Sequence, residues 1–305
     1  MAVSHAEKLE RRVALGTVVI PTIGVALAVL YGGRFGVPAH ALLSFGVLYV
    51  LTALGITVGY HRLITHRSFQ AHSWLRNVLI VLGSMAAQGP VIFWVVSHRR
   101  HHEATDRSGD PHSPHQRNRE SLSGVTGFWH AHLGWMLRPE GGDAGRYARD
   151  LLRDRTVVAL SYSYPIWVAV GLAIPTLSGY AATGTLHGCI AGFLFGGCAR
   201  IFALHHATWL VNSACHASGP RDFDTDDQSR NVFWVALLTL GEGWHNNHHA
   251  FPTSARHGLS WWQLDVSYLV IKCLAFCNLA NAVRVPSERE LGRKRYLAPE
   301  RALQL

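Results

Sequence analysis

The sequence predicts an all-helical integral membrane protein with four membrane-spanning helices and a polar helical cap that is rich in histidine. Its 305 residues are 49% hydrophobic and only 15% charged, whereas soluble domains carry roughly 25% charged residues. The apolar residues lie in long uncharged runs, and a helix needs about 20 apolar residues to cross a bilayer. The third observation is the 20 histidines, which concentrate in short motifs beside these runs.

Four of the uncharged runs are long enough to be spanning helices. The predicted spans are residues 13–33, 38–60, 156–177 and 184–204. Pro175 and the sequence Leu177–Ser178–Gly179 predict the turn between the third and fourth spans. The first run has no small-residue cleavage site after it, so it is expected to be retained as a span. No internal repeat or flexible linker is evident, so residues 1–305 are expected to form a single domain.

Basic residues predict the orientation of these spans. Lysine and arginine are frequent before the first span, between residues 61 and 155, and toward the C-terminus, whereas the short connectors on the other side contain Arg34 alone. Positive charge collects on the cytoplasmic side of a membrane. Both termini and a cap formed by residues 61–155 and 205–305 are therefore expected in the cytoplasm. Because the charge follows the membrane topology, it does not indicate nucleic-acid binding.

Two further apolar segments are expected not to cross the membrane. Residues 77–97 contain the helix breaker Gly89–Pro90 and have Arg76 and Arg99 on their flanks. A crossing here would also separate two histidine motifs that must share a compartment. The segment is therefore expected to be a membrane-surface or buried helix. Residues 260–282 mix tryptophans with charged residues, which predicts an interfacial amphipathic helix.

The histidines form three motifs and one looser pair, all at cytoplasmic ends of the predicted spans or in cytoplasmic segments. The motifs are HRLITH (His61 and His66), HRRHH (His98, His101 and His102) and HNNHH (His245, His248 and His249), and the pair is Asn212 and His216. Spacings of three and four residues place side chains on one face of a helix. Nine histidines that converge at one membrane depth are too many for one metal ion and about enough for two.

The types of ligand narrow the choice of metal. Imidazole-only coordination suits iron, zinc, copper or nickel. Structural zinc usually recruits cysteine, and catalytic zinc has three protein ligands with an open position. The five cysteines form no CxxC pair, and the zinc-protease motif HExxH is absent. Soluble di-iron bundles use carboxylates with two histidines. Two oxygen-activating irons, with imidazoles in place of carboxylates, are the interpretation that uses every motif.

Together these motifs resemble the membrane-bound fatty acid desaturases, specifically the Δ9, or stearoyl-type, branch. The matching blocks are GYHRLITHRSF, HRRHHEATDRSGDPHS, HLGWML, ATWLVNSACH and GEGWHNNHHAFPTSARHGL, in family order. The resemblance implies four spans under a cytosolic cap that holds a di-iron centre. The implied ligands are His61, His66, His98, His101, His102, His216, His245, His248 and His249, with Asn212 reaching an iron through water. Trp94, Thr208 and Trp209 are implied to line the tunnel for the acyl chain.

The resemblance also implies an oxygen-dependent reaction that introduces a cis double bond, at Δ9, into a saturated long-chain acyl group. A methylene C–H bond has no acidity and no leaving group, so its oxidation needs a metal cofactor. Two Fe2+ ions are the implied cofactor, and O2 is the implied co-substrate. The electrons are expected from a separate donor, such as a ferredoxin or a cytochrome b5-type protein with its reductase. A bacterial inner membrane is the expected location.

Several alternatives stay open at this point. A hydroxylase or an acetylenase would share the motifs, whereas a zinc-dependent membrane hydrolase or a metal transporter would need neither iron nor O2. The acyl carrier is open between a glycerolipid, acyl carrier protein and coenzyme A. In animal relatives an acidic residue often precedes the second motif, where this chain has Ser97 after Val95 and Val96. Those relatives also have a basic pair after the HxGW element, where this chain has Leu137–Arg138–Pro139–Glu140, and the basic residues missing here are assigned to Val96 and Pro139–Glu140. Basic residues there would bind phosphates, so a carrier other than free coenzyme A is expected.

The remaining histidines are expected to have supporting roles. His5, His40, His72, His187 and His257 are predicted to be structural, and His112 and His115 to order the polar loop after the second motif. His205 and His206 are adjacent and close to the metal ligands in the sequence of the fourth span. A packing role, or one around the ligands, is predicted for them rather than direct binding of a metal.

Overall fold

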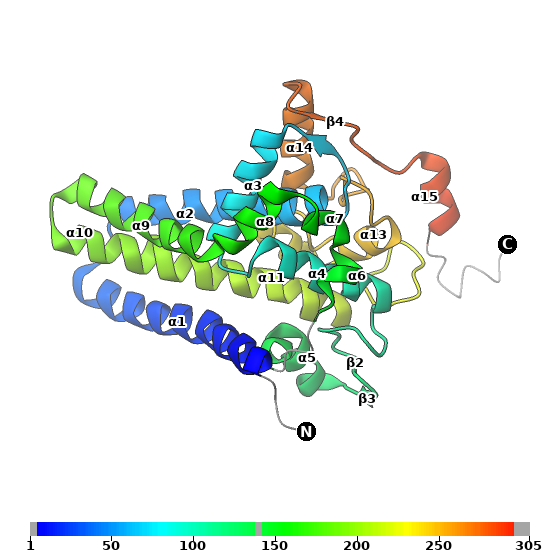
Figure 1. The fold of residues 1–305 in the computed structure, drawn as a ribbon, viewed down its shortest axis with the longest axis horizontal. Helices are drawn as coiled ribbons and strands as arrows, with labels where there is room; N and C mark the ends of the chain where they lie inside the picture. Colours follow the sequence, from blue (N-terminus) through cyan, green and yellow to red (C-terminus); the bar gives the residue numbers. More distant parts are fainter. Residues whose placement is uncertain (1–4, 138–141, 296–305) are drawn as a thin grey trace. The chain divides into compact units, whose positions relative to one another are not determined.

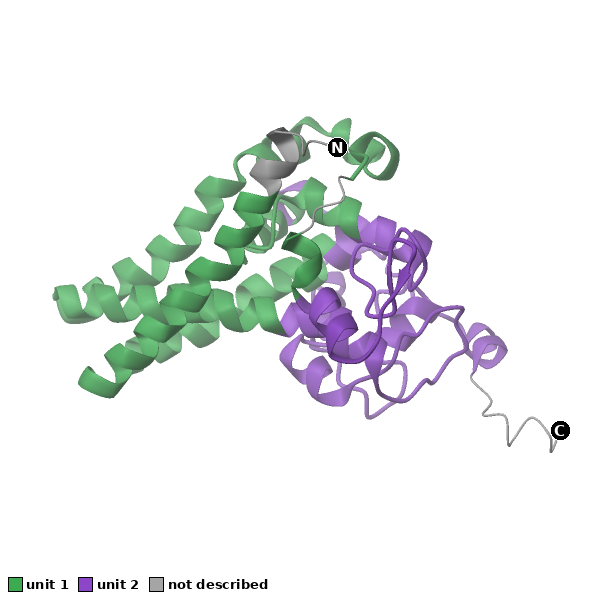
Figure 2. Ribbon diagram, turned by 90° about the horizontal axis from the view of Figure 1, so that it is seen from below, with its two compact units in different colours: residues 1–60, 76–97, 133–206 green, residues 61–75, 98–132, 207–305 purple. Residues whose placement is uncertain are grey.

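A computed structural model of the chain describes residues 5–137 and 142–295, and it is built almost entirely from helices (Figure 1). The helical class predicted from the sequence is confirmed. By its contacts the chain divides into two compact units, which are coloured separately in Figure 2. Unit 1 contains residues 1–60, 76–97 and 133–206, and unit 2 contains residues 61–75, 98–132 and 207–305.

Four helices in the described residues are long and apolar enough to cross a membrane, which is the predicted number. They are Arg11–Phe35, Ala39–Thr65, Tyr164–Thr183 and Leu186–Ala217. The first lies in α1 (His5–Phe35), and the third is α9 (Tyr164–Thr183). The second is α2 (Ala39–Leu54) followed without a break by the π-helix η1 (Gly55–Thr65). The fourth joins α10 (Leu186–Ala191), the π-helix η3 (Gly192–Ala199) and α11 (Arg200–Ala217).

Helices of unit 1 pack closely because glycines stand where a side chain would not fit. A Cβ atom on Gly179 would lie 2.1 Å from the carbonyl oxygen of Gly188, and one on Gly192 would lie 2.0 Å from that of Pro175. Small residues allow such close approach between helices in a membrane. The glycine content of the third and fourth spans therefore serves their packing.

The third span begins later than residue 156, where the sequence analysis places it. Arg155–Tyr162 form a separate helix, α8, whose N-cap Asp154 accepts hydrogen bonds from two backbone N–H groups. Helix α9 starts after Ser163, with Pro165 in its first turn. Proline is favourable there because the first backbone N–H groups of a helix have no intrahelical partner.

The turn expected at Leu177–Ser178–Gly179 is wrong. Helix α9 continues through Pro175 and ends at Gly184, whose φ of 66° is the left-handed conformation that commonly terminates helices. The fourth span then runs to Ala217 rather than to residue 204. Proline therefore does not end this helix, and the glycine beyond it does.

Residues 77–97 form parts of two short helices rather than one long one. Helix α3 (Ser73–Met85) and helix α4 (Val91–Ala104) contain 13 and 14 residues, so each is about 20 Å long, short of the roughly 30 Å hydrocarbon core. Between them Ala87 and Gly89 have φ values of 58° and 102°. The break predicted at Gly89–Pro90 is confirmed, and neither helix is long enough to span.

Short helices and turns make up the rest of the chain. In unit 1 these are η2 (Gly134–Leu137), α6 (Ala144–Tyr147) and α7 (Arg149–Leu152). Unit 2 contains α5 (Gly124–His132), α12 (Phe233–Leu238), α13 (His245–Ala250), α14 (Val266–Phe276) and α15 (Glu288–Lys294). It also contains two small antiparallel pairs, β1 (Gln70–Ala71) with β4 (Ala280–Asn281) and β2 (Gln116–Arg117) with β3 (Glu120–Ser121). The helix predicted at residues 260–282 is thus shorter, with an exposed turn at Trp261 before it.

Candidate metal centre

The structure brings the nine histidines of the three motifs and the Asn212–His216 pair together within unit 2, in two groups. The first contains His61, His66, His98, His102 and His248, and the second contains His101, His216, His245 and His249. In each group one ring nitrogen per residue lies within 4.8 Å of all the others. They are supplied by η1 and the residue after it, by α4, by the end of α11 and by α13. We call them the five-histidine group and the four-histidine group.

The three imidazoles of each HxxHH motif do not all belong to the same group, although the sequence analysis placed them on one helix face. On α4, His98 and His102 enter the five-histidine group while His101 enters the other. On α13, His245 and His249 enter the four-histidine group while His248 enters the first. The i and i+4 residues therefore stay together and the i+3 residue diverges. Each short helix contributes to both groups and so fixes their separation.

The spacing of five in HRLITH has a different origin. His61 lies in the last turns of the π-helix η1, and the backbone N–H of His66 donates to the carbonyl oxygen of His61 over 3.1 Å. An i to i+5 bond is the repeat of a π-helix, which places both imidazoles on the same side, with ring centroids 4.8 Å apart. In an α-helix, residues five apart would point in different directions. The π-turn is therefore what brings both histidines of this motif to one group.

Distances between the donor atoms indicate how many ligands a metal would have. Two nitrogens bound at about 2.1 Å lie about 3.0 Å apart when they are at right angles and about 3.4 Å apart in a tetrahedron. In the five-histidine group the Nε2 separations are 3.0 Å (His66–His98), 3.1 Å (His98–His102), 2.9 Å (His102–His248) and 3.1 Å (His248–His61). Five donors at these separations fit a metal with more than four ligands, and they do not fit tetrahedral zinc.

Carboxylates fix the tautomer of four of the nine imidazoles. Each Nδ1 donates to one carboxylate, at 2.6 Å for His61 to Glu242, 3.0 Å for His101 to Asp110, 2.9 Å for His216 to Asp106 and 2.9 Å for His249 to Asp227. Because neutral imidazole carries one N–H, its Nε2 atom then holds a lone pair. This carboxylate–histidine arrangement is typical of metal ligands.

The same tautomers show that the four-histidine group fits a cation. The Nε2 separations are 3.0 Å (His216–His245), 3.1 Å (His245–His249) and 3.4 Å (His249–His101). Three of these four atoms carry lone pairs, so at most His245 has a proton to donate. Lone pairs that face one another at these distances repel unless a cation lies between them. The donor set therefore fits a metal ion.

Burial keeps the other ligands in the neutral form that a metal requires. Desolvation and the neighbouring imidazoles hold the pKa of His98, His102 and His248 well below its usual range. Burial alone would raise the pKa of Asp110, but the His101 imidazole lowers it below the usual range. The rings of His98, His102 and His248 are thus neutral donors, and the Asp110 carboxylate stays ionised.

Sequence reasoning missed these carboxylates. Glu242 stands three residues before the third motif, Asp106 and Asp110 follow the second, and Asp227 lies in a loop. Glu242 is also held by Arg62, whose side chain is fully buried and whose Nη2 donates to it over 3.1 Å. The signal was present in part, because three of these acids lie inside the quoted blocks GEGWHNNHH and HRRHHEATDRSGDPHS.

Two of the histidines given supporting roles are found beside the ligands. His257 forms a third cluster with His61 and Glu242, and His112 forms a fourth with His101 and Asp110. His205, in unit 1, lies 3.0 Å from the carbonyl oxygens of Ala86 and Ala87 through Nε2. A structural role for His257 and a packing role for His205 agree with these contacts.

The structure gives the surroundings of the predicted tunnel residues and of Asn212 but does not test their roles. Trp209 is buried on α11 and meets the ring of His132 edge-on, with centroids 5.8 Å apart. Thr208 and Asn212 lie on the same helix and are partly buried, and Asn212 is one turn before His216. Trp94 is in unit 1, against Tyr60. Their roles stay predictions.

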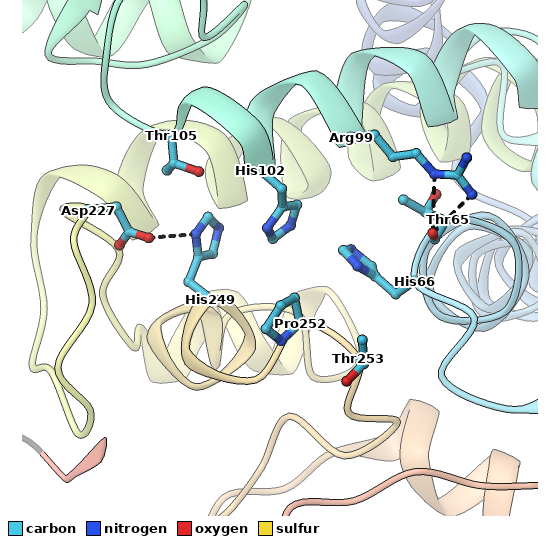
Figure 3. A pocket seen from close by; sticks show the side chains of 9 residues that line it. All are labelled: Thr65, His66, Arg99, His102, Thr105, Asp227, His249, Pro252 and Thr253. Atoms are coloured by element: carbon cyan, nitrogen blue, oxygen red, sulfur yellow. Dashed lines mark hydrogen bonds and ion pairs between the residues drawn. The ribbon is translucent and has the colours of Figure 1, made fainter. Parts of the chain in front are cut away.

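A pocket of about 380 Å3 in unit 2 opens onto both groups (Figure 3). It is lined by His66 and His102 of the five-histidine group, by His249 of the four-histidine group, and by Thr65, Arg99, Thr105, Asp227, Pro252 and Thr253. Figure 3 shows Asp227 bonded to His249, and Arg99 bonded to Thr65. The histidine groups are therefore accessible from one polar side.

Comparison with known proteins agrees with this site. A family model described as fatty acid desaturase matches residues 11–267. The chain is 40% identical to the hex-5-enoyl-[acyl-carrier protein] acetylenase of Moorena producens, over 91% of this chain and 87% of that protein. It is 41% identical to the sn-1 stearoyl-lipid 9-desaturase of Anabaena variabilis (80% and 84%) and 40% identical to that of a Synechocystis species (81% and 73%). The resemblance seen in the histidine motifs is confirmed, and the chain belongs to the fatty acid desaturase family.

Proposed function

We propose that this desaturase uses two iron ions and O2 to introduce a cis double bond at the Δ9 position of a saturated long-chain acyl group. The observation that carries the proposal is the division of nine histidines into groups of five and four, with carboxylate-fixed tautomers. When bound, the metal supplies the strong oxidant that a methylene C–H bond requires and that side chains lack. The protein holds the Nε2 lone pairs in place.

Iron is favoured over zinc by the donor set. The five-histidine group offers more nitrogens than the four ligands that zinc takes in structural sites, and no cysteine is among the residues that approach it. Imidazole ligands suit iron, and a redox-active ion is needed because desaturation removes two electrons from the acyl chain. The other electrons that are needed to reduce O2 would come from a separate donor, such as a ferredoxin or a cytochrome b5-type protein. A zinc hydrolase or a metal transporter would not belong to this family.

The Δ9 position is supported by two relatives of about 40% identity whose names specify 9-desaturation of stearoyl lipids. An acetylenase is the second candidate, because the relative from Moorena producens matches 91% of this chain at 40% identity. An acetylenase starts from an existing double bond, whereas a desaturase starts from a saturated chain. A hydroxylase would share the same metal ligands and differs only in the product.

A carrier other than free coenzyme A is also part of the proposal. Val96 is only 4% exposed and faces Gly142, where an added Cβ would lie 2.4 Å from it, so this position cannot offer a charge to a phosphate. Pro139 and Glu140 lie outside the described residues. Two relatives are named for carrier-protein-linked and lipid-linked chains, whereas two others, 40% and 39% identical, are named as acyl-CoA desaturases. The uncharged position of Val96 is therefore what supports this part of the proposal. We therefore propose glycerolipid or acyl carrier protein, and purified enzyme with a reducing partner should turn over stearoyl-CoA most slowly of the three stearoyl substrates. Fastest turnover of stearoyl-CoA at micromolar concentration would overturn this part.

The metal centre and both termini are proposed to face the cytoplasm, in a bacterial inner membrane. The support is the sequence asymmetry of lysine and arginine, together with four helices of spanning length. An even number of spans puts both ends of the chain on the same side. A cytoplasmic face would also give the histidine groups access to soluble electron donors.

Expression in a desaturase-deficient host, followed by double-bond mapping of its fatty acids, tests the reaction. The unmodified chain and His72→Ala, an exposed histidine outside both groups, should both yield Δ9-monounsaturated chains. His98→Ala should yield none. A triple bond would favour the acetylenase and a hydroxyl group the hydroxylase, while a double bond at another carbon would overturn the Δ9 assignment.

A further inference from the structure

The two histidine groups differ in the charge that surrounds them. In the four-histidine group, three of the four imidazoles have a carboxylate on Nδ1, and these are Asp106, Asp110 and Asp227. In the five-histidine group, the one such ion pair found within residues 5–137 and 142–295 is that of His61 with Glu242. The neutral ligands are alike in the two groups, so the carboxylates are what distinguishes them.

The three aspartates are held by hydrogen bonds in the interior, Asp110 fully buried and Asp106 and Asp227 partly buried. Asp110 is 2% exposed, and its oxygens accept hydrogen bonds from the backbone N–H groups of Asp106 and His112. Asp106 accepts from Ser113 and from the N–H of Gln228. Asp227 accepts from the hydroxyl and the N–H of Ser229. These partners are neutral groups, so they stabilise the carboxylates without cancelling their charge.

Glu242 is in a different situation because it belongs to a network that also contains a cation and a second carboxylate. The guanidinium of Arg62 donates to Glu242 through Nη2 at 3.1 Å and Nε at 3.3 Å, and it pairs with Asp265 at 2.9 Å. The side chain of Arg62 is 0% exposed, so this charge acts at low dielectric and is weakly screened. The five-histidine group therefore lies beside a network with one net negative charge, against three beside the other group.

We infer that the two metal positions are electronically unequal: the four-histidine group holds the more highly charged ion, and the five-histidine group takes up the first added electron. A carboxylate on Nδ1 raises the basicity of the imidazole, and its charge favours a trivalent over a divalent ion. The fifth imidazole of the other group is neutral and strengthens binding of both charge states. The inference rests on the proposed two-iron function and adds an order of reduction to it.

The expected size follows from the number of carboxylates. Loss of one such partner typically costs 10–100-fold in metal affinity. If each favours the trivalent ion by about tenfold, a surplus of two aspartates gives roughly a hundredfold preference. For a one-electron couple a tenfold change in the equilibrium constant is about 59 mV, so a hundredfold preference is about 120 mV.

Single-site variants measure this preference directly. The double variant His66→Ala/His102→Ala leaves the four-histidine group intact and three imidazoles in the other group. His245→Ala leaves the five-histidine group intact and three imidazoles in the other group, and neither variant removes one of the histidines that pair with a carboxylate. Full-length protein in detergent is loaded with Fe2+ and titrated with dithionite and ferricyanide, with Fe3+ followed by electron paramagnetic resonance. We expect one iron per chain in each variant, and a reduction potential in His66→Ala/His102→Ala that is lower than that in His245→Ala by about 120 mV, the hundredfold preference above.

A second measurement keeps the inference testable if a single-site variant does not bind iron. Asp110→Asn in the otherwise unchanged chain keeps an acceptor for His101 but removes the charge. The equilibrium constant for reduction should therefore increase by about tenfold in one of the two reduction steps. Asp222→Asn is the matched control, because the Asp222 carboxylate contacts the amides of Asn231 and Gln263. It should move neither step.

The outcomes separate the inference from the proposed function. Equal potentials in the two single-site variants, or an unchanged pair of steps in Asp110→Asn, would overturn the unequal positions while leaving two irons in place. Active unmodified protein with zinc, or with fewer than two irons per chain, would instead remove the proposed function on which the inference rests.

Discussion

Replacement of Arg62 by leucine removes a buried cation from the network that connects the first histidine motif to the third. The Arg62 guanidinium bonds Glu242, the Asp265 carboxylate at 2.9 Å and the carbonyl oxygen of Ala255 at 2.7 Å. Glu242 in turn accepts from the Nδ1 of His61. Arg62→Leu therefore leaves two buried carboxylates without a counter-charge.

The size of the effect follows from this burial. Removing one partner of a buried ion pair typically destabilises a protein by about 3–5 kcal/mol, because the other charge stays buried and uncompensated. Since about 1.4 kcal/mol is a factor of ten, the folding equilibrium should shift by about a hundredfold to several thousandfold. Arg62→Lys keeps the charge but not the planar fork, so its loss should be intermediate.

Arg76→Leu is the matched control for the assay. Arg76 pairs with Asp154 at 2.7 Å, but the two side chains are 26% and 32% exposed, and such pairs contribute about 0–1 kcal/mol. Unfolding of each variant in detergent is followed by tryptophan fluorescence at one fixed iron concentration, because bound metal itself stabilises the folded state. Bound iron is measured in parallel. Equal stability and equal iron content in Arg62→Leu and Arg76→Leu would refute the reasoning.

Three further predictions follow from the site and the fold. Active purified protein should contain about two irons per chain, and His98→Ala and His249→Ala should each abolish activity and lower the metal content; full iron content in either variant would contradict the ligand assignment. Cysteines at Ser73 and Ser108, introduced singly without the native cysteines, should label from the same membrane side, and labelling from opposite sides would contradict four spans. Gly192→Ala places a Cβ 2.0 Å from a backbone carbonyl, so its thermal unfolding in detergent should occur at lower temperature than that of Gly33→Ala, where nothing lies within 4 Å.

The class of fold and the nine histidines could be predicted from the sequence because both depend on local features. Uncharged runs of the sequence predict the spanning helices, and the motif spacings of three to five residues lie within one or two helical turns. The division of each HxxHH motif between two groups could not be predicted in this way. It depends on which helices face α4 and α13, and the rings of His101 and His248 turn toward partners more than 100 residues away.

Carboxylates and helix ends were harder to predict for the same reason. Asp227 reaches His249 from a loop 22 residues earlier, and Asp106 reaches His216 across 110 residues, so no periodic pattern connects them. The start of the third span depends on the cap at Asp154. Its end depends on the positive φ of Gly184, two residues before the next helix. Such contacts and backbone angles are properties of the folded chain.

Charge balance explains why a site made of neutral ligands carries acids around it. Nine neutral imidazoles leave the charge of two divalent ions uncompensated in a buried place, which is costly. The four carboxylates on the ligand Nδ1 atoms are Asp106, Asp110, Asp227 and Glu242. Arg62 and Asp265 cancel one another. Two divalent ions therefore make the whole centre neutral, whereas one would leave two buried negative charges in excess. The charge of the acids around the histidines thus agrees with the proposed two divalent ions, independently of the count of histidines.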